Sequence, residues 1–208
     1  VGRAELLGCF AMTETGHGSN VKELETTATY VHERRIIIVH TPHEGAGKEY
    51  IGNALHGSMA AVFAQFIVNG ENHGIHAVLV PYRDAKGDLL PGITVRDCGY
   101  KLGLNGVDNG RLWFDNVEVP LDNLLNRYGD VDADGRYTSP IENDNKRFFT
   151  MLGALVGGRI CVGLAGGVRD ADEGDAHGLA AREDAGAAAE IRLENVGDEG
   201  RDDGEVHL

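Results

Sequence analysis

Short apolar runs with the two-residue period of β-strands occupy most of the chain between residues 7 and 119. β-Branched and aromatic residues are frequent in these runs, and turn signals such as Asn69-Gly70 and Asn105-Gly106 separate them. No helical pattern intervenes. This argues against a doubly wound nucleotide-binding sheet and predicts a mainly β fold, a β-barrel or sandwich. The predicted strands are Leu7–Met12, Glu25–His32, Arg35–His40, Ala60–Val68, Ile75–Pro81, Pro91–Val95 and Gly110–Val119.

A helical period replaces the strand pattern after an irregular polar connection over residues 121–143. Apolar residues recur at helical spacing from Lys146 to Leu164, and Asn143 or Asp144 is the expected N-cap. Gly157-Gly158 interrupts this pattern, so the segment is not expected to form a stable helix in isolation.

The composition changes again beyond Gly167. Residues 168–208 hold 13 Asp or Glu and 4 Arg, a net charge of −9, and few large apolar side chains. Such a segment cannot offset the entropy of ordering, so we expect a disordered acidic tail or the product of a shifted reading frame. The whole chain has a net charge of −14, which argues against nucleic acid as a partner. Its longest apolar stretch, Met59–Val68, is too short to span a membrane.

Two features resemble metal-binding patterns. The segment Asp130-x-Asp132-x-Asp134-Gly135 opens like a calcium loop, but Ile141 stands where a bidentate Glu is required, so a solvated acidic turn is predicted. Two histidine pairs have a three-residue spacing, but residues so spaced on a strand point to opposite faces, and no cysteine lies nearby. We therefore predict no metal site. The pairs are His40 with His43 and His73 with His76.

The segment Phe10–Asn20 leads from an expected strand into a glycine-rich loop. Thr13 enters this loop, and Gly16 and Gly18 allow backbone N–H groups and small hydroxyls to approach a flat, electron-accepting ring. On these residues alone, an ordinary surface turn is the favoured explanation. Ser19 does not lie in a nucleophile elbow, so nucleophilic catalysis is not expected.

Further blocks accompany this segment in a fixed order, from Gly8–Tyr30 to Ser139–Asn143. Together they resemble the middle domain of acyl-CoA oxidases, within the wider acyl-CoA dehydrogenase superfamily, over about residues 5–166. The Glu25–Tyr30 block and the Asp130–Tyr137 insert look more like the oxidase branch than like the simple dehydrogenases. The intermediate blocks are Lys48–Ala54, Leu90–Val95, Lys101–Pro120 and Asn123–Asp130.

The resemblance implies FAD as cofactor and α,β-dehydrogenation of a fatty acyl-CoA to a trans-2-enoyl-CoA. The electron acceptor is then O2, and the pathway is fatty acid β-oxidation. The resemblance places Thr13 and Gly52 against FAD, as cofactor-binding residues. It places Ser19 and Asn20 beside the thioester and pantetheine part of the substrate.

The family's catalytic Glu belongs to a C-terminal helical domain, and nothing after Gly167 resembles that domain. No catalytic residue is therefore assigned, and we expect the chain alone to be inactive and to bind FAD very weakly. For Met12 and Glu14, a structural role is expected at least as much as a direct contact. Two alternatives stay open: an acyl-CoA dehydrogenase that uses an electron-transfer protein, and a non-catalytic β-domain that binds acyl-CoA or a partner.

The resemblance also divides the chain. We expect a flavin-binding middle β-domain over residues 1–120 and a connection over residues 121–143. Residues 144–167 then form the first helix of a truncated C-terminal helical domain, and residues 168–208 the acidic tail. The expected partner is fatty acyl-CoA, with no nucleic acid and no membrane span, and the full-length enzyme is expected to be a homo-oligomer. The expected location is cytoplasmic, or peroxisomal in a eukaryote.

Overall fold

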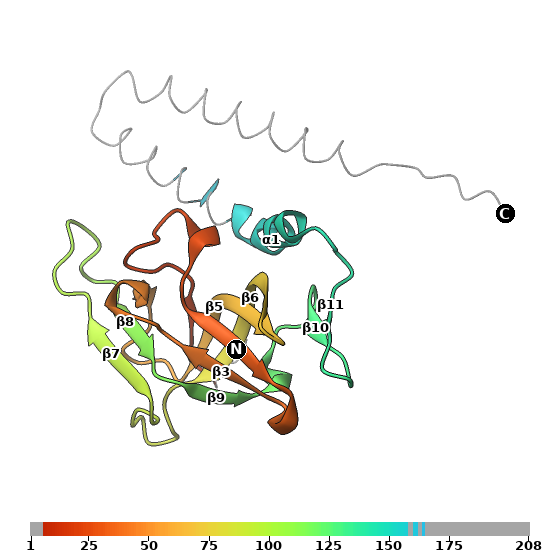
Figure 1. Cartoon of the computed structure of the whole chain (residues 1–208). Helices are drawn as coiled ribbons and strands as arrows, with labels where there is room; N and C mark the ends of the chain where they lie inside the picture. Colours follow the sequence, from red (N-terminus) through yellow and green to blue (C-terminus); the bar gives the residue numbers. More distant parts are fainter. Residues whose placement is uncertain (1–5, 158–159, 162–163, 165–208) are drawn as a thin grey trace, which may run out of the picture. The chain divides into compact units, whose positions relative to one another are not determined.

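The computed structural model describes residues 6–157, 160–161 and 164 (Figure 1). Its contacts divide the chain into two compact units, residues 1–149 and residues 150–208. The predictions for residues 168–208 lie outside the described residues. Within the described ranges, no helix is long and apolar enough to cross a membrane.

Six strands form the larger sheet, which confirms the mainly β fold predicted from the alternating pattern. They are β1 (Gly8–Ala11), β2 (Thr27–Val31), β3 (Ile36–His40), β5 (Met59–Val68), β6 (Glu71–Pro81) and β9 (Val117–Pro120). β5 and β6 form a hairpin through Asn69 and Gly70, whose φ angles of 52° and 80° suit a two-residue turn. On its other edge, β5 pairs in parallel with β1 and then with β2. β3 lies between β2 and β9, and β3 and β9 run side by side in Figure 1.

The second sheet holds three strands in the order β4-β8-β7: β4 (Lys48–Gly52), β7 (Ile93–Asp97) and β8 (Asn109–Phe114). The single strand predicted over Gly110–Val119 is wrong, because this run splits into β8 and β9, which belong to different sheets. Asn116, between them, has a φ of 49°, which turns the chain from one sheet to the other. Short 3-10 turns connect the strands: η1 (Val21–Glu23), η2 (His32–Arg34), η3 (Glu44–Ala46) and η4 (Leu121–Asn123).

One hydrophobic cluster contains side chains from both sheets, so the sheets share a single core. Its largest fully buried members are Tyr82, Phe66, Phe114, Ile37, Ile51 and Leu112. Among the described residues, four Glu, Lys, His or Arg side chains are almost equally buried, at 2% exposure or less: Glu14, Lys48, His76 and Arg147. Buried groups of this kind need partners, and they mark the two places where polar contacts hold the fold.

A hairpin of β10 (Asp130–Val131) and β11 (Tyr137–Thr138) lies in the connection that the sequence predicted to be irregular. The Tyr137 ring stacks on His73 with centroids 4.0 Å apart, and Tyr137 Oη lies 2.9 Å from His76 Nε2. The prediction that His73 and His76 point to opposite faces is wrong, since both rings contact Tyr137. Gly74, with a φ of 76°, breaks the alternation of β6 between them.

Helix α1 (Asp144–Leu152) begins where the N-cap prediction placed it, with Lys146 N donating to Asn143 Oδ1 at 2.9 Å. Arg147 lies in its first turns and is 2% exposed. Its guanidinium donates to Ile141 O at 3.1 Å and lies 5.4 Å from the centroid of the Tyr137 ring. The α-helix gives way to the 3-10 turn η5 (Gly153–Leu155), consistent with the low helix propensity of glycine.

We expect Gly129→Ala to lower the free energy of unfolding by about 1–3 kcal/mol, through overpacking. A Cβ at this position would lie 2.4 Å from both His76 Nε2 and Tyr137 Oη. Urea denaturation measures the change, and Gly106→Ala is the matched control, because no atom lies within 4 Å of the Cβ it adds. Equal stability of the two variants would contradict the packing of Gly129 against this cluster.

Candidate functional site

The segment after β1 runs antiparallel to the segment that leads into β4. Thr13 begins this ladder: its hydroxyl donates to Glu49 O at 2.6 Å, and Glu49 N donates back to Thr13 O at 3.0 Å. Because the hydroxyl hydrogen is used within the protein, the remaining capacity of Thr13 Oγ1 is to accept a hydrogen bond. Two more backbone bonds continue the ladder, Thr15 N to Gly47 O (3.0 Å) and Gly16 N to Gly45 O (2.9 Å).

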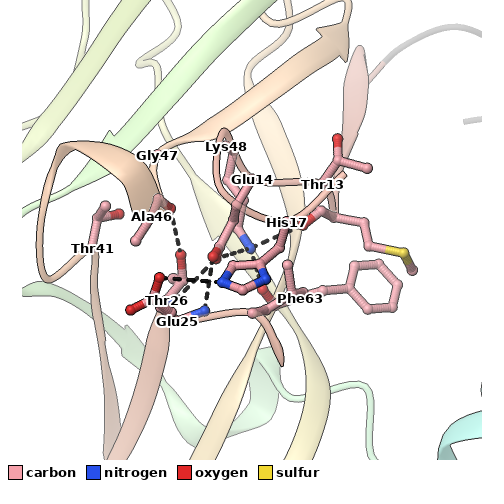
Figure 2. A network of polar contacts seen from close by, with 12 residues as sticks. Thr13, Glu14, His17, Glu25, Thr26, Thr41, Ala46, Gly47, Lys48 and Phe63 are labelled. Atoms are coloured by element: carbon pink, nitrogen blue, oxygen red, sulfur yellow. Dashed lines mark hydrogen bonds and ion pairs between the residues drawn. The ribbon is translucent and has the colours of Figure 1, made fainter. Parts of the chain in front are cut away.

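A fully buried ion pair lies beneath this ladder. Figure 2 shows the Lys48 and Glu14 side chains pointing toward one another, with Lys48 Nζ 2.9 Å from Glu14 Oε1 and both side chains at 0% exposure. Burial lowers the pKa of Lys48 to about 8, although Glu14 opposes the shift. Burial alone would raise the pKa of Glu14, but Lys48 and hydrogen bonds from Glu25 and Thr26 outweigh it, so this pKa lies below its ordinary value.

The second half of β4 is irregular. Its pairing register with β8 shifts between Lys48 and Ile51, and Tyr50 takes a φ of 58°, a conformation that costs a bulky residue on the order of 1–3 kcal/mol. The bulge exposes 62% of Tyr50. Gly52 is exposed, and the nearest atom to a Cβ built there is Asp108 O at 3.9 Å, so its backbone is open to a ligand.

Ser19 and Asn20 lie beyond the ladder, and both are exposed. Neither side chain forms a hydrogen bond with any residue that the structure describes, so the polar network does not join them to Thr13. The same loop is held at His17, whose Nε2 lies 3.3 Å from one oxygen of Glu25. The other oxygen of Glu25 lies 2.8 Å from His43 Nε2.

The model of the family described as "Acyl-CoA dehydrogenase, middle domain" matches residues 9–117, which include the ladder, the ion pair and the bulge. The chain belongs to this family. Its relatives include peroxisomal acyl-coenzyme A oxidase 2 of Arabidopsis thaliana, which is 54% identical over 166 residues, or 76% of this chain and 24% of that protein. The chain spans about a quarter of the length of the curated relatives it matches.

Two solved structures show the same fold. Acyl-CoA oxidase 1 from Yarrowia lipolytica has a TM-score of 0.69 and 43% identity, covering 74% of this chain and 22% of that one. Acyl-CoA oxidase-2 of Caenorhabditis elegans, solved with FAD, ascaroside-CoA and ATP, has a TM-score of 0.65 and 42% identity. The match covers 67% of this chain and 22% of that chain. The recognised resemblance to acyl-CoA oxidases is therefore confirmed.

The residues of this middle domain fit a flat cofactor ring such as flavin. Thr13 offers an acceptor, and β4, which pairs with Thr13 through Glu49, carries the exposed Tyr50 ring and the open backbone of Gly52. Sequence reasoning missed Tyr50, because only the bulge in β4 explains its exposure. It also missed Lys48, since lysine is among the residues most often exposed.

The histidine and aspartate patterns do not converge on a metal site. In the part of the chain that the structure describes, no group of three or more His, Cys, Asp or Glu is arranged to hold a metal ion. Asp132 instead closes the β10–β11 turn by accepting hydrogen bonds from Asp134 N at 2.9 Å and Arg136 N at 2.8 Å. Such side-chain acceptors are typical of aspartate in turns.

Proposed function

We propose that this chain forms the cofactor-facing wall of an acyl-CoA oxidase. The reaction is the FAD-dependent α,β-dehydrogenation of a fatty acyl-CoA to a trans-2-enoyl-CoA, with O2 as electron acceptor, in fatty acid β-oxidation. One structural observation carries the proposal: the Thr13 hydroxyl donates to the backbone carbonyl of Glu49 in the bulged strand β4, which leaves Tyr50 and Gly52 exposed. The oxidase relatives support it, as do the FAD and ascaroside-CoA bound to one solved neighbour.

Within this proposal, FAD supplies the group that accepts the hydride from the substrate. Thr13 orients the ring through a hydrogen bond, and Gly52 allows the ring to approach the backbone. Ser19 and Asn20 lie in the exposed part of the loop, where their free hydrogen-bonding groups suit the polar thioester and pantetheine region of the substrate. The base that removes the C2 proton is assigned to no residue of this chain.

The division into domains, the partner, the oligomeric state and the cellular location are proposed from the same resemblance. Residues 1–120 are assigned to the flavin-binding domain and 121–143 to the connection, and residues 144–167 to the start of a helical domain, of which α1 (Asp144–Leu152) is the described part. The complete enzyme binds fatty acyl-CoA and is a homo-oligomer. Relatives named as peroxisomal support a peroxisomal location in a eukaryotic cell, with the cytoplasm as the location otherwise.

An acyl-CoA dehydrogenase that passes electrons to an electron-transfer protein is the second candidate, since the description of the matching family names dehydrogenases. The two candidates differ in the fate of the electrons. Hydrogen peroxide formed with O2 and a fatty acyl-CoA in a complete enzyme would support the oxidase. Turnover that requires an electron-transfer protein would contradict it.

FAD titration of the purified chain, followed by flavin fluorescence, tests the proposed wall. We expect weak but saturable quenching, with the flavin lost on desalting because this chain offers one side of the site. Thr13→Val removes one hydrogen-bonding hydroxyl and should weaken binding by about fivefold to tenfold. Gly52→Val covers the open backbone and should weaken it at least tenfold, as an order-of-magnitude expectation.

The control for the glycine substitution is Gly106→Val, which places a side chain in open space outside the proposed wall. It should leave the FAD affinity at the wild-type value. Equal affinities for wild type, Thr13→Val and Gly52→Val would remove these residues from the cofactor site. An absence of saturable binding by the wild type would contradict the proposal for this chain.

A further inference from the structure

We propose that Lys48 is a positioning residue. Its buried ammonium fixes the Thr13 hydroxyl and the Glu49–Gly52 backbone against β5 as one rigid unit, without touching a ligand. The use of that unit to hold a cofactor rests on the proposed function, whereas its rigidity does not.

The three donors of the Lys48 ammonium reach three different places in the chain (Figure 2). Nζ donates to Met12 O at 3.1 Å, just before Thr13, and to Glu14 Oε1 at 2.9 Å, just after it. It also donates to Phe63 O, in the middle of β5, at 2.6 Å. One side chain therefore holds both flanks of Thr13 and ties them to the larger sheet.

Glu14 extends this connection to the far end of the loop. Its two oxygens accept from Thr26 N at 3.0 Å and Glu25 N at 2.8 Å, where the chain enters β2. Thr26 Oγ1 in turn donates to Ala46 O at 3.1 Å, in the turn before β4. The loop from Thr13 to Glu25 is thus closed at both ends by one ion pair.

Stability alone does not account for a buried lysine at this place. Replacing a buried ion pair by apolar residues of similar volume is often neutral or stabilising, because two charges no longer lose their hydration. An ammonium with three acceptors at 2.6–3.1 Å instead specifies where each acceptor lies. The geometry points to a role in position rather than in net stability.

The test separates these two roles with the double variant Lys48→Met/Glu14→Gln. It removes both charges and nearly keeps the side-chain volumes. The single amide oxygen at position 14 can still accept from one of the two N–H groups, of Glu25 and Thr26, that the two Glu14 oxygens now bind. We expect a melting temperature between those of Lys48→Met and the wild type, because no charge is left uncompensated but the Met12 and Phe63 carbonyls lose their donor. The amides of Thr15 and Gly16, which belong to the ladder, should nevertheless exchange with solvent at least tenfold faster, as an order-of-magnitude expectation.

NMR on the full chain measures the amide exchange rates of wild type and double variant. The amides in the centre of β5 are the internal control. Wild-type exchange at Thr15 and Gly16 in a folded double variant would overturn the proposal. Ladder and core amides that accelerate together would overturn it too, since the effect would then be a global loss of stability.

If the double variant does not fold, the wild type provides the same test. Among the described residues Lys48 forms its ion pair with Glu14, and burial lowers the pKa of Lys48 to about 8. Loss of that proton as the pH rises leaves the Glu14 carboxylate uncompensated. Protection of the Thr15 and Gly16 amides, corrected for intrinsic exchange, should therefore fall between pH 6.5 and 9 relative to the core amides. Constant protection would overturn the proposal. FAD titration is a separate measurement, and its failure would contradict only the proposed function.

Discussion

Lys48→Met alone is expected to lower the free energy of unfolding by about 3–5 kcal/mol, in contrast to the double variant. The single substitution removes the cation and leaves the Glu14 carboxylate at 0% side-chain exposure with no opposite charge. Its two backbone donors, the N–H groups of Glu25 and Thr26, cannot replace a full positive charge. Without Lys48, burial raises the pKa of the Glu14 carboxyl, although the hydrogen bonds from Glu25 and Thr26 still lower it.

Urea denaturation at pH 7 measures this loss, and Lys22→Met is the matched control because Lys22 is exposed. The control should change the free energy of unfolding by no more than about 0.5 kcal/mol. The stability lost in Lys48→Met should also return in part when Glu14→Gln is added, because the uncompensated charge disappears. A loss in Lys48→Met as small as that of the control would show that the ion pair is not buried in solution.

The strands of the larger sheet were predictable because their burial follows a local period. The run Arg35–His40 becomes β3 (Ile36–His40), and Ala60–Val68 becomes β5 with one residue added at its start. The split of Gly110–Val119 was not predictable in the same way. The buried residues are Leu112 and Phe114 before Asp115-Asn116, and Val117 and Val119 after it. The two-residue period therefore shifts by one position at Asn116, where the chain changes sheet.

The candidate site was predictable from the sequence only through the resemblance. Thr13 and Gly52 lie 39 positions apart in the sequence. The backbone ladder between the segment that begins at Thr13 and the segment that leads into β4 brings the two regions together. The same long-range pairing buries Lys48, although lysine is a residue type that a sequence pattern alone predicts to be exposed. For Glu14, the expectation of a structural role agrees with its burial, whereas the identity of its partner depends on the tertiary fold.

The polar cluster around Tyr137 consists of His73, His76 and Arg147. Because of His76, we expect the protein to lose stability in mild acid. His76 is 1% exposed, and burial is the main cause that lowers its pKa from 6.5 to about 4. The nearby Arg147 and His73 act in the same direction, whereas the Gly74 carbonyl and Asp144 oppose it. The folded protein therefore holds His76 neutral over a pH range in which the unfolded chain binds a proton there.

The sign of the pH dependence follows from this difference. The contribution of neutral His76 to stability is complete above pH 6.5 and is lost as the pH falls from 6.5 to about 4. A shift of this size corresponds to a loss of about 3 kcal/mol between these limits. The Tyr137 and Arg147 contacts that hold the β10–β11 hairpin and the start of α1 are expected to weaken in the same range.

Urea denaturation at a series of pH values from 7 to 4 measures this loss in the wild type and in His76→Gln. The glutamine cannot titrate, and its amide can still form a hydrogen bond with Tyr137 Oη. We expect the variant to lose about 3 kcal/mol less than the wild type over this range, so that the two stability curves converge in acid. His56→Gln, which removes an exposed histidine, should follow the wild-type curve. Parallel curves for wild type and His76→Gln would mean that His76 has the same pKa in the native and unfolded states, and would contradict its burial against Phe66 and Tyr137.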